Sequence, residues 1–234
     1  MSEGVEHHDL RSSATHVLLE DPAGLAGAHI EIDDDVEHHL RRVLRLRDGE
    51  RVSVTDGAGR WRMSVVVGGP RLSLEASSEI VTLPEPDRFT LATAIPKGDR
   101  IDWLVQKVTE LGADRVLLMN AERSAVRWKP ERAGKQVIRL QRIADEALRQ
   151  SRRVWRCTVD GPVDAADVLG RAAVAEPGGV AISGDEPLIA IGPEGGWTDD
   201  ELNRAQKRVT IGSNILRTET AGIAVTTLRM VADH

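Results

Sequence analysis

The chain has 234 residues, of which 41% are hydrophobic and 29% charged, and its formal net charge is −6 at pH 7. This composition is typical of an ordinary globular protein, and the single cysteine, Cys157, excludes an internal disulfide. No apolar run is long enough to span a membrane, and the polar first ten residues do not resemble a signal peptide, so we expect a cytoplasmic protein.

Residues 15–82 are predicted to form a small β-rich unit, because short segments with β-branched residues are separated by glycines. Strands are expected at His16–Leu19, His29–Ile32, Arg51–Thr55 and Trp61–Val67. The turn Asp56–Gly59 joins the last two strands as a hairpin. One helix, from about Asp34 to Leu46, interrupts the strands. The pattern favours a compact β-barrel-like domain.

Two prolines within the segment Thr82–Asp87 interrupt both helix and sheet, so we expect a domain of residues 1–82 and a second of residues 83–234. In the second part, strands alternate with amphipathic helices, which predicts a mostly parallel sheet covered by helices. The expected strands are Phe89–Ile95, Arg115–Met119, Val154–Val159, Leu188–Ile191 and Val209–Ile211. The expected helices are Asp99–Leu111, Lys135–Arg149, Thr198–Lys207, which opens with a Thr198–Glu201 capping box, and Glu219–Val231.

Two loops follow predicted strands at the edge where open α/β sheets bind ligands. The first, Ile191–Gly196, has three glycines that let a backbone approach a ligand closely, but it is neither a dinucleotide fingerprint nor a Walker loop. The second, Ile211–Ala221, places an apolar pair before Arg217 and Glu219. An ordinary helix start explains Glu219 but not Arg217, because a cation is unfavourable at the positive end of the helix dipole.

Basic residues gather in two segments although the net charge is negative. Residues 123–156 contain eleven Lys or Arg and three acidic residues. The second run consists of Arg41, Arg42, Arg45, Arg47 and Arg51. Either run alone is better explained as a solvated helix face, but two runs in an acidic chain favour an RNA partner. The pairs His7–His8 and His38–His39 lack further ligands at metal-binding spacing, so we expect no metal.

Together the two loops, with the sequences GPEGG and ILRTETA, resemble the RsmE family of SPOUT methyltransferases. Segments similar to further family blocks are His39–Arg45, Pro96–Arg100, Gln106–Gly112, Glu122–Ser124, Glu146 and Gln150–Arg153. The resemblance covers nearly the whole chain and departs mildly at Ile211–Gly212, where the family often has Leu-Gly. That family methylates N3 of a uridine in small-subunit (16S) ribosomal RNA with S-adenosylmethionine (SAM).

The resemblance implies a PUA-like β-barrel followed by a SPOUT α/β trefoil-knot domain that works as a homodimer on ribosomal RNA or the small ribosomal subunit. It implies SAM binding by Ile191, Gly192, Pro193, Glu194, Gly195, Gly196, Ile211, Gly212, Ile215, Leu216 and Thr220. Arg217 is expected to stabilise the developing uracil anion or a nearby phosphate, and Glu219 is a weaker candidate for the proton acceptor. RNA contacts are expected from Arg41, Arg42, Arg45, Lys97, Arg149, Arg152 and Arg153.

Other interpretations stay open from the sequence. The chain could be a SPOUT enzyme that acts on another RNA site, which methyl transfer to ribosomal versus transfer RNA would distinguish. It could also be a non-catalytic RNA-binding module that keeps the fold but not SAM, although the intact GPEGG and ILRTETA loops argue against this. For Arg217 itself, the alternative role is a salt bridge to Glu194 or Glu219 that holds the two loops together.

Overall fold

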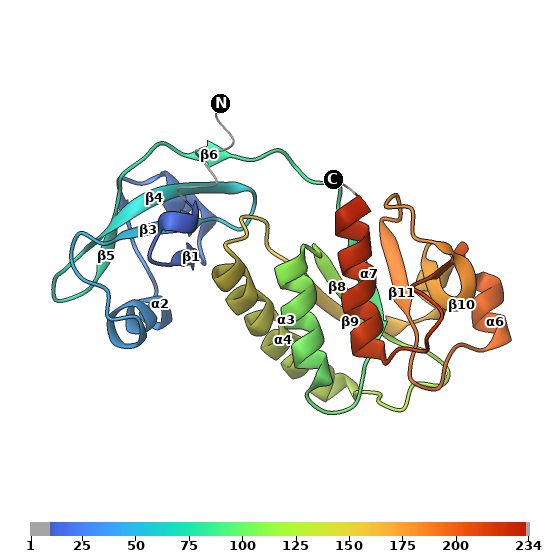
Figure 1. Cartoon of the computed structure of the whole chain (residues 1–234). Helices are drawn as coiled ribbons and strands as arrows, with labels where there is room; N and C mark the ends of the chain where they lie inside the picture. The colour runs from blue at the N-terminus through green and yellow to red at the C-terminus, as the bar shows by residue number, and fades with distance from the viewer. Residues whose placement is uncertain (1–9, 233–234) are drawn as a thin grey trace. The chain divides into compact units, whose positions relative to one another are not determined.

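A computed structural model describes residues 10–232, so the His7–His8 pair lies outside the described residues. The chain divides into two compact units, each described here by itself (Figure 1). Unit 1 comprises Met1–Pro86 together with Leu148–Arg156, and unit 2 comprises Asp87–Ala147 together with Cys157–His234. A short segment from the middle of the chain therefore belongs to the N-terminal unit.

Within unit 1 the described residues form a six-stranded sheet in the order β1-β3-β4-β5-β2, with β6 also paired to β4. The strands are β1 (His16–Leu18), β2 (His29–Ile30), β3 (Arg51–Thr55), β4 (Arg60–Val67), β5 (Ser73–Ala76) and β6 (Val81–Thr82). Strand β1 runs parallel to β3, and the other pairs are antiparallel. Alternate aliphatic side chains, such as Val52, Val54 and Leu74, point inward and form a hydrophobic core.

The predicted helix Asp34–Leu46 is two consecutive pieces in the structure. Helix α2 (Asp34–His38) begins where the Asp33 carboxylate accepts a hydrogen bond of 2.7 Å from the backbone N–H of Val36. It continues into the wider π-type turn η2 (His39–Val43), which buries Leu40 in the core. A short 3-10 helix, η1 (Pro22–Ala26), completes this unit.

The segment 148–156 is bound to the rest of unit 1 by backbone hydrogen bonds. The N–H of Gly59 donates to the carbonyl of Val154, and the N–H of Arg156 donates to the carbonyl of Gly57. Nε2 of the buried His16 lies 2.9 Å from the carbonyl oxygen of Arg153. These bonds explain why the predicted strand Val154–Val159 starts late: its first residues pair with the turn of unit 1 instead.

Unit 2 contains a six-stranded sheet in the order β12-β10-β11-β7-β8-β9, counted over the described residues. The strands are β7 (Thr90–Ala94), β8 (Arg115–Asn120), β9 (Thr158–Asp164), β10 (Ala173–Ala181), β11 (Leu188–Ile191) and β12 (Lys207–Thr210). Every neighbouring pair is parallel. The central strands are buried along their length, as expected for a parallel sheet with helices on both faces.

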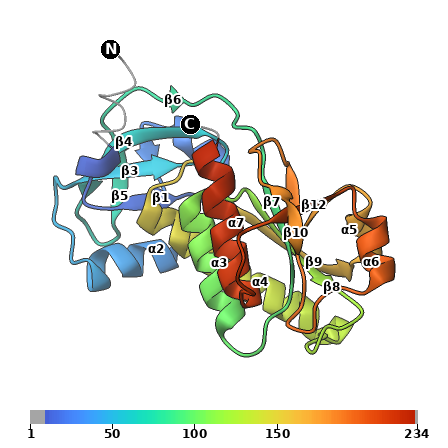
Figure 2. The same cartoon turned by 45° about the vertical axis from the view of Figure 1, so that its right-hand side comes forward.

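The helices of unit 2 are α3 (Arg100–Leu111), α4 (Pro130–Ser151), α5 (Ala166–Leu169), α6 (Asp199–Arg204) and α7 (Thr218–Ala232). Residues of α3, α4 and α7 share one hydrophobic cluster with the sheet, and α5 and α6 cover the other face (Figure 2). Cys157 is buried in the first cluster. The expected α/β domain with a mostly parallel sheet is therefore confirmed.

Strand β10 is the element that the sequence pattern did not predict. Its sequence, AVAEPGGVA, contains a proline and two glycines, and its pairing register with β12 shifts between Ala175 and Val180. Helix α6 is shorter than predicted and ends at Arg204, because the N–H of Gln206 already donates to the carbonyls of Leu169 and Ala172. Over residues 10–232, no helix is long and apolar enough to cross a membrane.

Candidate cofactor and RNA site

The two loops singled out in the sequence meet at the carboxyl edge of the parallel sheet. A cavity of about 350 Å³ lies between the loop after β11 and the loop after β12, beside the first turn of α7. Ten of the eleven expected cofactor residues line it, and Thr220 does not. Thr218 and Ala221 line it instead, because residues three apart share a helix face, whereas Thr220 is exposed on another.

Hydrogen bonds hold the segments around this cavity together. The buried Thr218 hydroxyl donates to the carbonyl of Gly192 at 3.0 Å and so joins the start of α7 to the β11 loop. The indole N–H of Trp197 donates to the carbonyl of Ala175 at 3.3 Å, which brings in a third segment. That segment, residues 175–177, lines the cavity but was missed because its strand was not predicted.

Two of the three loop glycines are needed for packing within the protein. A Cβ atom at Gly192 would lie 2.8 Å from the Trp197 ring, and one at Gly195 would lie 3.1 Å from Cβ of Arg123. Only at Gly196, where φ is +71°, would a Cβ meet no described atom within 4 Å. The glycines therefore let this loop pack against its neighbours as much as against a ligand.

The loop after β8 supports the GPEGG loop from the side. Arg123 donates from its guanidinium to the carbonyl of Trp197 at 3.0 Å. The predicted capping box of α6 is present, with the Glu201 carboxylate accepting from the backbone N–H of Thr198. The other oxygen of Glu201 accepts a bond of 2.9 Å from the N–H of Glu122. One buried carboxylate thus fixes the end of the cofactor loop to its neighbour.

The salt bridge considered for Arg217 is made by Arg100 instead. Arg100 lies at the start of α3, and its Nη1 is 2.5 Å from Oε1 of Glu194 while its Nε is 3.7 Å from Oε1 of Glu219. Arg217 is exposed, and within residues 10–232 its side chain forms no ion pair or hydrogen bond. Its guanidinium is therefore free to contact a substrate, whereas Arg100, which sequence reasoning did not select, joins the two loops.

The charge of the cavity lining is negative. Glu176 and Glu194 line the cavity, and no Lys or Arg does so among the residues that the structure describes. Such a lining disfavours phosphate groups, which need basic side chains or clustered N–H donors. It suits a ligand that carries positive charge beside apolar surface, supplied here by Ile211, Ile215 and Leu216.

The expected RNA-binding residues fall in two groups. Arg41, Arg42, Arg45, Arg149, Arg152 and Arg153 all belong to unit 1, and the exposed Lys97 lies in the loop after β7 of unit 2. The Arg152 guanidinium donates to the carbonyls of Leu10 and Ser13, at 2.6 and 2.8 Å, and to the Ser13 hydroxyl. Arg152 therefore has a structural role, and we remove it from the RNA-binding set.

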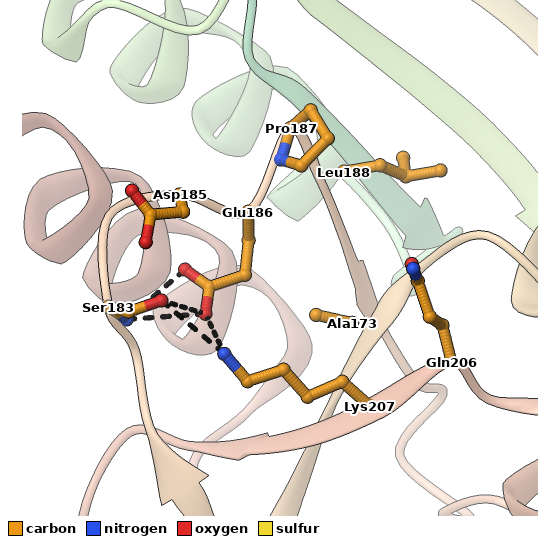
Figure 3. Close-up of a pocket in the computed structure, with 8 residues that line it drawn as sticks. All are labelled: Ala173, Ser183, Asp185, Glu186, Pro187, Leu188, Gln206 and Lys207. Atoms are coloured by element: carbon orange, nitrogen blue, oxygen red, sulfur yellow. Dashed lines mark hydrogen bonds and ion pairs between the residues drawn. The ribbon is translucent and has the colours of Figure 1, made fainter.

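A second cavity of about 380 Å³ lies at the opposite edge of the same sheet (Figure 3). Burial alone would raise the pKa of Glu186, but hydrogen bonds from Lys207 and Ser183 outweigh this effect and lower its pKa to about 2. The Lys207 ammonium is 2.5 Å from the carboxylate, so the two charges neutralise each other. This arrangement leaves little binding capacity for a ligand. No cluster of three or more His, Cys, Asp or Glu suited to a metal is found over residues 10–232.

Comparison with known proteins identifies the family. Residues 83–230 match the family described as "RNA methyltransferase domain", and residues 32–77 match the one described as "RNA methyltransferase PUA domain". The chain belongs to this RNA methyltransferase family. Its two matched regions correspond to the expected order of a PUA-like domain followed by a methyltransferase domain, and that expectation is confirmed.

Relatives of this methyltransferase narrow the family further. The chain is 33% identical over 228 residues to "Ribosomal RNA small subunit methyltransferase E" of Synechocystis, covering 87% of this chain and 73% of the relative. The protein of the same name from Bacillus subtilis is 31% identical, with 79% and 82% covered. The structure of the Neisseria gonorrhoeae protein of that name, bound to S-adenosyl methionine, superposes with a TM-score of 0.81 at 28% identity, covering 93% of this chain and 97% of that one. The resemblance to the RsmE family, with its SPOUT fold, is thereby confirmed.

Proposed function

We propose that this protein transfers a methyl group from SAM to N3 of a uridine in 16S ribosomal RNA. The observation that carries the proposal is the cavity at the carboxyl edge of the parallel sheet, formed by the GPEGG and ILRTETA loops. Its volume of about 350 Å³ falls within the range typical of cofactor pockets. The SAM-bound relative from Neisseria gonorrhoeae supports the choice of cofactor.

The residues present fit SAM. Ile211, Ile215 and Leu216 offer apolar surface for the adenine ring, and the glycine-rich backbone offers hydrogen bonds to its edge. Glu176 and Glu194 place negative charge where a sulfonium and an ammonium group need it. When bound, SAM supplies an electrophilic methyl group, and the chain supplies the position and the electrostatic environment.

The acceptor requires help from the protein, because N3 of uracil carries a proton and is a poor nucleophile until that proton leaves. Glu219 is the proposed proton acceptor, and Arg217, with its free guanidinium, stabilises the developing uracil anion or a neighbouring phosphate. Holding the two reactants in line accounts for much of the rate enhancement. A paired uridine has to be flipped out of its helix, or be unpaired already, to reach the site.

The RNA is proposed to contact basic side chains in both units. In unit 1 these are Arg41, Arg42, Arg45, Arg149 and Arg153, and in unit 2 Lys97. Arg41 is partly engaged, since it donates to the carbonyl of Gly69 at 2.9 Å, whereas Arg42 and Arg45 are exposed. The partner is ribosomal RNA or the small ribosomal subunit, which places the activity in the cytoplasm.

A homodimer is part of the proposal. Helices α3 and α7 pack side by side and leave large apolar side chains in solvent: Trp103 is 47% exposed, Leu228 42% and Val231 68%. A terminal helix with apolar residues on more than one face usually has a second surface to cover. A second copy of this chain is the proposed occupant, and sedimentation at micromolar concentration should show a dimer. An active monomer would rule this out.

The experiment that tests the function begins with a calorimetric titration of SAM. Tritium transfer from labelled SAM to 16S ribosomal RNA, and in parallel to transfer RNA, then identifies the substrate, and mass mapping locates the methylated base. Binding of SAM with methylation of a uridine at N3 supports the proposal. Methylation of transfer RNA alone would favour another SPOUT activity, and absence of SAM binding would favour a non-catalytic RNA-binding module.

The RNA surface is tested by an Arg41/Arg42/Arg45→Ala triple variant. For every phosphate that the variant no longer neutralises, the salt dependence of RNA binding should flatten by about 0.7 to 0.9 log units per log unit of salt. A matched control removes three exposed arginines of unit 2, Arg171, Arg204 and Arg208, none of which is assigned to RNA. An unchanged slope in the first variant would remove this part of unit 1 from the RNA site.

A further inference from the structure

Arg100 lies between two carboxylates that belong to different cofactor loops. Its strongest contact, 2.5 Å from Nη1, is with Glu194 of the GPEGG loop, and both of these side chains are more than a third exposed. Its second contact, 3.7 Å from Nε, is with Glu219 in the first turn of α7. The second distance is too long for a hydrogen bond, so Arg100 acts on Glu219 through charge and position.

Glu219 is unusual because it is buried and incompletely paired. Its side chain is only 7% exposed, and its Oε2 has no hydrogen-bond partner among the described residues. Leaving a buried carboxylate oxygen without a donor costs free energy, so such an atom in a folded protein calls for an explanation. The positive end of the α7 dipole and the guanidinium of Arg100 both favour the ionised form, which offers Oε2 as an acceptor.

We propose that Arg100 is a positioning residue for methyl transfer. It holds Oε1 of Glu219 towards its guanidinium and so leaves Oε2 available for the proton on N3 of uracil. Glu194 in turn fixes Arg100. In the reaction the N3 proton passes to Oε2, the electron pair left on N3 forms the new bond to the methyl carbon, and the electrons of the broken S–CH3 bond remain on sulfur. The proposal rests on the function proposed above, and in particular on Glu219 as proton acceptor.

A simpler role for Arg100 would be to join the loops mechanically. That role explains the short contact with Glu194, but it does not explain why a buried oxygen of Glu219 is left without a donor. The two roles differ in what the removal of the guanidinium should change. A mechanical role predicts weaker SAM binding and lower stability, whereas a positioning role predicts slower turnover with SAM binding retained.

The test compares Arg100→Gln, Arg100→Lys, Glu219→Gln and the Arg100→Gln/Glu219→Gln double variant. Each is measured for SAM affinity by calorimetry without RNA, for thermal unfolding, and for kcat and KM on a 16S ribosomal RNA fragment. The matched control is Arg139→Gln, since Arg139 is 43% exposed on its side chain and pairs with Asp102 of the same helix α3. This control should lower stability slightly and leave kcat unchanged.

If Arg100 positions Glu219, Arg100→Gln should lower kcat about tenfold or more, equivalent to about 1.4 kcal/mol, with the SAM Kd and the KM for RNA within twofold of the parent. Arg100→Lys should recover part of the activity, because it keeps the charge. In the Glu219→Gln background, Arg100→Gln should have no further effect on kcat, because its target is already gone.

Two results would overturn the inference. Independent, multiplicative losses of kcat in the double variant would show that Arg100 does not act through Glu219. A tenfold weaker SAM Kd together with a lower melting temperature in Arg100→Gln would show that it only joins the loops, and this readout does not depend on activity. Failure of the proposed function has a different signature: the parent itself would bind SAM and methylate no ribosomal RNA, and Arg100 would then have no proton transfer to support.

Discussion

The hydrogen bond from Thr218 to Gly192 offers a direct test of how the two cofactor loops are held together. Thr218 is 3% exposed, and its hydroxyl is 3.0 Å from the carbonyl oxygen of Gly192 across the cavity wall. Thr218→Val keeps the size and branching of the side chain but removes the donor. A net hydrogen bond contributes about 0.5–1.5 kcal/mol, and an orphaned buried carbonyl costs about 1–3 kcal/mol.

We therefore expect Thr218→Val to lower the free energy of unfolding by about 1–3 kcal/mol. If about 1.4 kcal/mol of this free energy reappears as the cost of bringing the loops together around SAM, the SAM Kd rises about tenfold. Chemical denaturation measures the first quantity, and isothermal titration calorimetry measures the second. Both measurements are made without RNA, so the result does not depend on the identity of the substrate.

The same helix provides a matched control in Thr226. Its hydroxyl donates to the carbonyl of Gly222 at 2.8 Å and is fully buried, but that carbonyl keeps its helical bond to a backbone N–H. Thr226→Val should therefore cost about 1 kcal/mol or less and leave the SAM Kd unchanged. The reasoning is refuted if Thr218→Val destabilises the protein while the SAM Kd stays within twofold of the parent.

Three individual side chains support further predictions. Arg217→Lys keeps the charge but loses the planar pair of donors, so turnover should fall about tenfold or more with SAM affinity and melting temperature retained; full turnover in this variant would exclude a catalytic role. Burial lowers the pKa of His16 from 6.5 to about 4, so the folded state resists protonation and stability should fall by about 2 kcal/mol from pH 7 to pH 5. Urea unfolding at both pH values should show that His16→Gln removes this contribution, and an equal pH dependence in the variant would assign it to other groups. Lys207→Met leaves the buried Glu186 without its cation and should cost about 1.5–3 kcal/mol in urea unfolding, with SAM affinity unchanged; weaker SAM binding would couple this distant ion pair to the cofactor cavity.

Much of the fold could be predicted because it depends on neighbours along the chain. Apolar runs such as Leu188–Ile191 are buried parallel strands whose pattern is visible locally, and the spacing of Thr198 and Glu201 predicts a capping box that the structure contains. The two loops could be placed at one edge because the carboxyl ends of parallel strands meet there. Strand β10 was missed, since the Glu-Pro-Gly-Gly sequence in its middle breaks the strand pattern and is tolerated only through an irregular pairing with β12.

The roles of individual charged residues were decided by tertiary structure. Arg152 looks like part of a basic RNA-binding run, yet its guanidinium is used by Leu10 and Ser13, about 140 positions earlier. Arg100 lies 94 positions from Glu194, and no local pattern distinguishes it from a solvated arginine at a helix start. Periodicity and capping report on residues within a few positions of each other. The partner of a long side chain depends on which distant segments the packed core brings within about 3–4 Å, and only the folded chain determines that.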